Sequence, residues 1–94
     1  SVTLGRPTLY GPDGETNTRR PTFTWGGVAF APAYQLRIDD LTSGEAAVYS
    51  ATTGSLDWTP PDDLIVDHTY RWYVRALNGS DLGVWSPGQT FWVV

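Results

Sequence analysis

The chain has 94 residues, a length typical of one domain, and ten acidic against six basic residues give it a formal net charge of −4 at pH 7. All six bases are arginines, and the only local excess, Arg19-Arg20, is too short for the concentrated basic face that a nucleic-acid partner requires. The absence of cysteine excludes disulfides and thiolate metal sites. No apolar run approaches the ~20 residues that cross a bilayer, so we expect no membrane insertion.

Short extended runs separated by turn residues recur along the chain, and no segment has the sustained 3.6-residue apolar period of a helix. The first run is expected to be an edge strand that ends in a turn at Gly11–Gly14. A hairpin turn is expected at Thr42–Glu45 and a loop at Asn78–Asp81. Seven strands are predicted, over Pro7–Tyr10, Pro21–Trp25, Tyr34–Asp40, Ala47–Ala51, Ser55–Thr59, Thr69–Leu77 and Gln89–Val94.

Alternation of apolar and polar side chains assigns inner and outer faces to these strands. In the clearest case, Tyr34, Leu36 and Ile38 point one way and the polar residues between them point the other. The pattern also predicts inward side chains at Leu56 and Trp58. In the last strand, Phe91 and Val93 are predicted to face inward and Trp92 outward.

Seven short strands in 94 residues predict an all-β fold, a seven-stranded antiparallel sandwich of two sheets with Greek-key connections. Residues 1–6 are expected to be an N-terminal tether, and residues 7–94 the domain. The chain begins with Ser1 rather than Met, and we expect it to be one module of a longer protein.

The motifs in these strands resemble a fibronectin type III module along nearly the whole chain from Pro7 to Val94. Pro21-x-Phe23-x-Trp25 resembles the second strand of that family, and Tyr34-x-Leu36-x-Ile38 resembles the third. Leu64, six residues before Tyr70, resembles the tyrosine corner, in which a buried tyrosine hydroxyl bonds the backbone of the preceding loop. The resemblance implies structural roles for Trp25, Tyr34, Leu64, Tyr70 and Trp72. An immunoglobulin-like sandwich is the alternative.

A second likeness concerns arginine and tryptophan. Arg71 and Arg75 flank Tyr73 on the outward face of one strand, and Trp85-Ser86 precedes the next. This resembles the arginine and tryptophan ladder of cytokine-receptor modules, although only half of the Trp-Ser-x-Trp-Ser motif is present. We predict that Trp85 stacks on Arg71 or Arg75.

The sequence offers little for catalysis, and we expect no enzyme activity and no cofactor. The single histidine, His68, is interpreted as a loop residue. The neighbours Asp39 and Asp40 should point to opposite faces of a strand and so cannot work as a pair. Calcium binding by Asp62, Asp63 and Asp67 is an open alternative without regular ligand spacing. Asn78-Gly79-Ser80 fits a glycosylation sequon but is interpreted as a turn.

Aromatic side chains are the candidate binding surface. Trp92 is expected to face outward, either as a platform with Tyr73 or Tyr49 or packed flat over a neighbouring strand. The leading hypothesis is a non-catalytic spacer or protein-interaction module of an extracellular or cell-surface protein, in tandem with neighbouring modules and monomeric when isolated. The alternative hypothesis is a carbohydrate-binding or adhesion module, with a protein or polysaccharide partner.

Overall fold

The computed structural model describes residues 3–94, which contain nine strands and no helix. The strands are β1 (Leu9–Gly11), β2 (Gly14–Thr16), β3 (Phe23–Trp25), β4 (Ala33–Asp40), β5 (Glu45–Thr53), β6 (Asp57–Trp58), β7 (Thr69–Asn78), β8 (Asp81–Leu82) and β9 (Gln89–Val93). A helix that could cross a membrane is therefore lacking in this part of the chain. Residues 1 and 2 of the expected tether lie outside the described residues.

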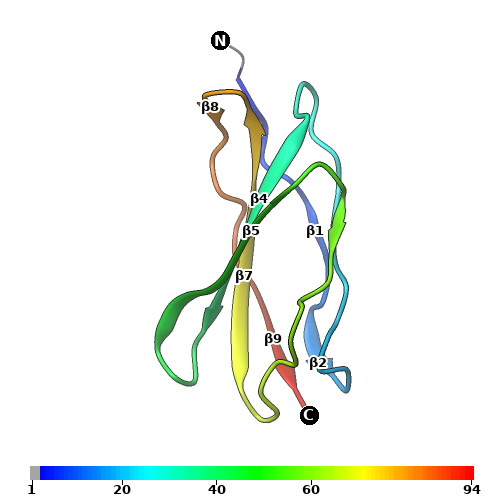
Figure 1. Ribbon diagram of the computed structural model, residues 1–94, viewed down its shortest axis with the longest axis vertical. Helices are drawn as coiled ribbons and strands as arrows, with labels where there is room; N and C mark the ends of the chain where they lie inside the picture. Colours follow the sequence, from blue (N-terminus) through cyan, green and yellow to red (C-terminus); the bar gives the residue numbers. More distant parts are fainter. Residues whose placement is uncertain (1–2) are drawn as a thin grey trace.

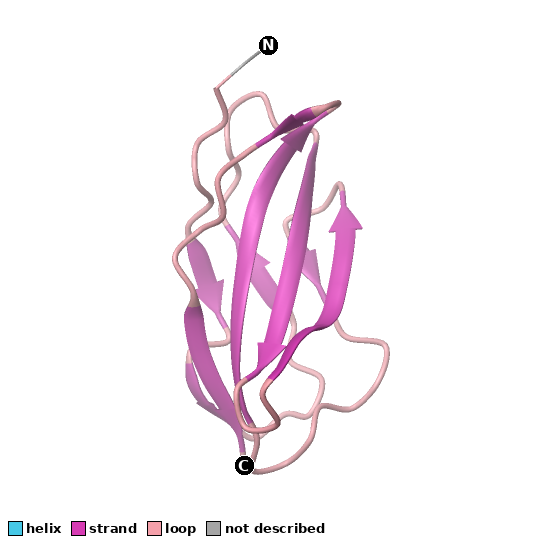
Figure 2. Ribbon diagram, turned by 90° about the vertical axis from the view of Figure 1, so that its left-hand side faces the viewer, coloured by secondary structure: helices cyan, strands magenta, loops and turns pink. Residues whose placement is uncertain are grey.

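The strands form two sheets that pack as the two layers of a β-sandwich (Figures 1 and 2). The smaller sheet has the order β1-β3-β6, and the larger sheet has the order β2-β9-β7-β4-β5, with β8 also paired to β7. Every pairing is antiparallel except that of β2 with β9, which is parallel. The prediction of an all-β, two-sheet fold is confirmed.

Alternating side chains make β4 and β7 the centre of the larger sheet. Tyr34, Leu36 and Ile38 of β4 are buried, as the sequence pattern predicts. β4 pairs with β7 over eight successive positions, from Ala33 opposite Leu77 to Asp40 opposite Tyr70. Along both strands, buried side chains alternate with side chains that are mostly half-buried, the pattern of a sheet with one face against the core.

Aromatic rings join the two sheets across the core. Phe23 of the smaller sheet meets Trp72 of the larger edge to face, with ring centroids 5.0 Å apart, and lies 5.5 Å from Phe91. Trp25 packs 6.4 Å from Trp72 and 6.1 Å from Tyr34. Aromatic pairs of this geometry stabilise a core by about 0.5–1.5 kcal/mol beyond the area they bury. Trp25 and Trp72, for which the resemblance implies structural roles, are both buried in this core.

The opening segment crosses from one sheet to the other, which the sequence did not predict. Instead of one edge strand followed by a turn, β1 joins the smaller sheet and β2 joins the larger one. Pro12 lies at the crossing, and its carbonyl accepts hydrogen bonds from Trp72 Nε1 and Gln89 Nε2, both at 3.0 Å. The three residues of β2 are polar or glycine and gave no strand signal, because their pairing depends on residues 77 positions away.

A second additional strand, β8, forms between β7 and β9. A tight turn at Gly79 and Ser80 starts β8, so Asn78 and Asp81 are strand residues rather than the loop expected. Between β8 and β9 the chain continues beside β7, where Ser86 N–H donates to Val74 O at 2.9 Å and Ser86 Oγ accepts from Val74 N–H at 3.0 Å. Nine strands replace the seven expected because β2 and β8 begin in segments where a turn and a loop were expected.

Two further expectations were wrong. The strand predicted over Ser55–Thr59 is reduced to β6, and Leu56 is 46% exposed rather than buried. The chain bends at residues 54–56, so Leu56 lies before the first residue of β6 and outside its alternation. Leu4 is buried in the core, so the packed body begins before Pro7 and includes part of the expected tether.

Candidate functional site

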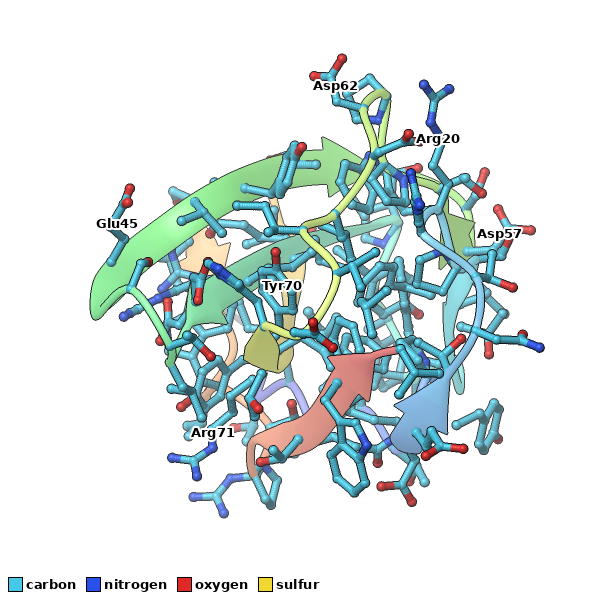
Figure 3. All side chains as sticks on the ribbon, turned by 90° about the horizontal axis from the view of Figure 1, so that it is seen from below. Arg20, Glu45, Asp57, Asp62, Tyr70 and Arg71 are labelled. Atoms are coloured by element: carbon cyan, nitrogen blue, oxygen red, sulfur yellow. The ribbon has the colours of Figure 1, made fainter. Side chains whose placement is uncertain are left out.

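The tyrosine corner is present, at the end of the molecule that faces the viewer in Figure 3. Ile65 N–H donates to the Tyr70 hydroxyl at 2.9 Å, and Leu64 is buried beside it. The Tyr70 ring stacks on Phe91 at 5.4 Å, so the ring is fixed in the core while its hydroxyl faces the loop. Burial raises the pKa of Tyr70 above its ordinary value. The side chain therefore ties the Asp62–Ile65 loop to the larger sheet.

A comparable contact occurs at the other end of the core. Val28 N–H donates to the Tyr34 hydroxyl at 2.9 Å, which fixes the connection between β3 and β4. The two tyrosines thus hold one loop at each end of the sandwich. The sequence had indicated a structural role for Tyr34 but not this hydrogen bond.

Arginines and aromatic rings alternate on the outer face of the larger sheet. The Arg75 guanidinium carbon lies 4.6 Å from the Trp85 ring centroid, which confirms the predicted stacking. Arg75 Nε also donates to Gln35 Oε1 at 2.8 Å. Arg71 instead donates to Thr90 Oγ1 at 3.2 Å. Arg75 is therefore the partner of the indole.

Arg37 extends this row across to β4. Its guanidinium carbon lies 5.8 Å from the Tyr73 ring centroid, and its Nε donates to Asp39 Oδ1 at 2.9 Å. That hydrogen bond raises the pKa of Arg37. Burial acts to raise the pKa of Asp39, but hydrogen bonds from Arg37 and from Ala47 N–H outweigh burial and lower it. Asp39 is a structural carboxylate in a row of charged and aromatic side chains.

The three aromatic candidates do not come together. Tyr49 lies opposite Ile38 in the β4–β5 pairing and packs against Trp58 at 5.8 Å, so its ring belongs to the inner side of the sheet. Tyr73 and Trp92 share the outer face, and Trp92 is 41% exposed as expected for an outward indole. Trp92 lies opposite Thr69 of β7. Tyr73 lies four residues farther along β7, so at the spacing of strand residues it is roughly 13 Å from Trp92.

Asp40 and His68 form a contact that sequence reasoning missed. His68 Nδ1 lies 2.8 Å from Asp40 Oδ2, and the Asp40 side chain is only 5% exposed. The backbone N–H groups of Thr42 and Ser43 both donate to Asp40 Oδ1 at 3.0 Å. Burial acts to raise the pKa of Asp40, but the His68 and backbone hydrogen bonds outweigh burial and lower it. The alternation that places Asp40 inward was the one available signal.

A groove of about 390 Å³ opens at this end, between β5 and the Asp62–Ile65 loop. Its lining consists of an apolar set, Val48, Tyr49, Leu64, Ile65 and Tyr70, and an acidic set, Asp40, Glu45, Asp62 and Asp63. Figure 3, which views this end directly, shows Glu45 and Asp62 at separate points of the rim and Tyr70 inside it. Burial first, and then the Asp62 charge, raise the pKa of Tyr49. The sequence placed these residues in separate strands and loops, so their meeting could not be foreseen.

The acidic residues considered for calcium are not arranged as one site. Asp63 is paired with Arg20 Nε at 2.8 Å. Asp67 has a positive φ of 69°, and its N–H donates to Val93 O at 2.7 Å. Within residues 3–94 no three His, Asp or Glu side chains gather closely enough to hold a metal ion.

Comparison with known proteins adds no relative to this description. No family model and no curated protein sequence matches the chain.

Proposed function

We propose that the chain is a non-catalytic module resembling fibronectin type III, which serves as a spacer or protein-interaction unit in a larger extracellular protein. The strand order supports this relationship, because β1-β3-β6 faces β9-β7-β4-β5 in the arrangement that the resemblance implies. The corner made by Leu64 and Tyr70 and the core position of Trp25 agree with it.

The observation that carries the spacer role is where the ends of the chain lie. The described residues span 42 × 21 × 21 Å, and the first and last of them lie at opposite ends of the long axis (Figure 1). Neighbouring modules attached at these ends would be held apart by the length of the sandwich. A chain that entered and left at one end would fold back instead of extending.

The pairing of β2 with β9 suits such a chain to tension. Gly14, Glu15 and Thr16 lie parallel to Phe91, Trp92 and Val93, and Val94 N–H donates to Thr16 O at 2.9 Å. Because the strands are parallel, a force that pulls β2 from its N-terminal end and β9 from its C-terminal end slides one strand along the other. All of these hydrogen bonds then oppose the force together.

Single-molecule force spectroscopy tests the proposal. Handles at residues 1 and 94 load β2 and β9 in shear, whereas handles at Asn17→Cys and residue 94 peel the same strands apart bond by bond. We expect a clearly higher unfolding force in shear. Val94→Pro, which removes the donor to Thr16 O, should lower that force, while Val94→Ala should not. Equal forces in the two pulling directions would contradict a tension-bearing spacer.

A polysaccharide-binding role is the second candidate, and the exposed Trp92 is the observation that favours it. The indole lies beside Glu15 of β2 and Thr69 of β7, so one ring rather than a broad aromatic platform would contact a sugar. A glycan array with the native chain and Trp92→Ala tests this role. Binding that is lost in the variant would support it, and no binding to any polysaccharide would contradict it.

A further inference from the structure

The free edge of β5 is exceptional among the strand edges of this molecule. The larger sheet ends in β2 and β5, and the smaller sheet ends in β1 and β6. The other three edge strands have two or three residues, whereas β5 has nine. Short edges offer few unpaired backbone groups to another chain. β5 is therefore the one long template for strand addition within residues 3–94.

Only the beginning of β5 is protected. Ala47 has a positive φ of 52°, and its N–H is taken by Asp39 Oδ1 at 2.7 Å, so the backbone there cannot extend a regular ladder. The remaining residues, Val48–Thr53, contain no proline and no charged side chain. Soluble proteins block exposed edges with such residues, and here they are missing.

The groove lies directly beside this edge and decides which side chains an added strand could carry. Tyr49 shows which face of β5 points toward the core, because it lies opposite the buried Ile38 of β4. Side chains of an added strand alternate in the same way, so those that point inward beside Val48 and Tyr49 would enter the groove between β5 and the Asp62–Ile65 loop. There they would meet the apolar floor of Tyr49 and Ile65.

The rim of the groove carries negative charge that is not neutralised within the described residues. Asp40 is paired with His68 and Asp63 with Arg20, but no ion pair is formed by Glu45 or Asp62 among residues 3–94. Arginine and lysine side chains combine an apolar stem with a charged end. An arginine or lysine whose apolar stem packs on Tyr49 and Ile65 would bring its charged end toward the carboxylates of Glu45 and Asp62.

We propose that β5 binds an extended peptide segment as an additional strand with alternate arginine or lysine side chains, of which those beside Val48 and Tyr49 enter the groove. A second copy of this chain does not fit, because β5 itself carries no basic residue and would bring Glu45 toward a second acidic rim. This inference goes beyond the spacer role, and the pulling experiment and the binding experiment can fail separately.

Three synthetic decapeptides test the proposal on the full chain. The first alternates threonine and arginine, the second has the same composition with the five arginines in one block, and the third replaces arginine by glutamate. Isothermal titration measures affinity, and amide hydrogen exchange locates the bound peptide. We expect the alternating arginine peptide to bind and to protect amides in Val48–Thr53. The block peptide should bind several-fold more weakly, and the glutamate peptide should not bind.

Matched charge variants complete the test. Glu45→Gln and Asp62→Asn should each weaken the alternating peptide about two- to fivefold, the effect of losing one exposed ion pair. Asp57→Asn removes the same charge from an exposed carboxylate in β6, outside the groove lining (Figure 3), and should leave affinity unchanged. Thermal unfolding of each variant confirms that it is folded. Equal binding of the block peptide, protection outside β5, an equal effect of Asp57→Asn, or no binding of the alternating peptide would each overturn the proposal.

Discussion

Tyr70→Phe isolates the hydroxyl of the tyrosine corner, because phenylalanine keeps the ring that stacks on Phe91 and leaves no cavity. The variant removes the acceptor of Ile65 N–H, a partly buried donor. Leaving a buried donor unpaired costs about 1–3 kcal/mol, and partial access to water places this case at about 1–2 kcal/mol. In a domain of this size, 1 kcal/mol lowers the unfolding midpoint by about 4–8 °C. We therefore expect a decrease of about 4–16 °C.

Thermal unfolding followed by circular dichroism measures this change, and Tyr73→Phe is the matched control. The Tyr73 hydroxyl makes no side-chain hydrogen bond within residues 3–94, and its ring lies on the outer face beside Arg37. Removing that hydroxyl should change stability by less than about 0.5 kcal/mol. If Tyr70→Phe and Tyr73→Phe lower the midpoint equally, the corner hydrogen bond does not stabilise the loop as argued.

Two other changes probe the outer face and the buried carboxylate. A double-mutant cycle of Arg75→Gln and Trp85→Leu, measured by urea unfolding, should give a coupling energy of about 0.5–1 kcal/mol, and additivity would contradict the stacking. The folded-state pKa of Asp40 is lowered, so its stabilisation is present above its unfolded pKa of about 3.9 and is lost as pH falls through the folded value. Unfolding measured from pH 6 to pH 2 should show a shallower acid loss in Asp40→Asn. An unchanged slope would show that the contact with His68 does not contribute.

The strands that could be predicted from the sequence are those whose signal is local. In β4, alternation over eight residues fixes both the strand and the buried side of Tyr34, Leu36 and Ile38. β2 was missed because Gly14–Thr16 has no apolar side chain, and its strand conformation comes from pairing with β9. Leu56 was misplaced because the chain bends at residues 54–56 and β6 begins only after it. Alternation in the sequence does not show where a strand begins or with which distant strand it pairs.

The candidate sites also differ in whether their sequence signal is local. Stacking on Trp85 and the corner at Tyr70 could be predicted because each is carried by a short motif that resembles a known sandwich module. The groove was missed because its rim joins Glu45 at the start of β5 to Asp62 in a loop, and only the packing of the two sheets brings them together. The Asp40–His68 contact likewise spans 28 residues of chain.

The meeting of β2 and β9 also determines when this fold can be completed during synthesis. A ribosome releases the chain from its N-terminal end, so Gly14–Thr16 emerges long before Phe91–Val93, the only strand with which it pairs. Until then residues 69–72 of β7 lack their neighbour on one side, and their backbone is open to other nascent chains. The final strand of this domain to be translated therefore closes the larger sheet, and a domain interrupted before Phe91 would leave the edges of β2 and β7 uncovered at once.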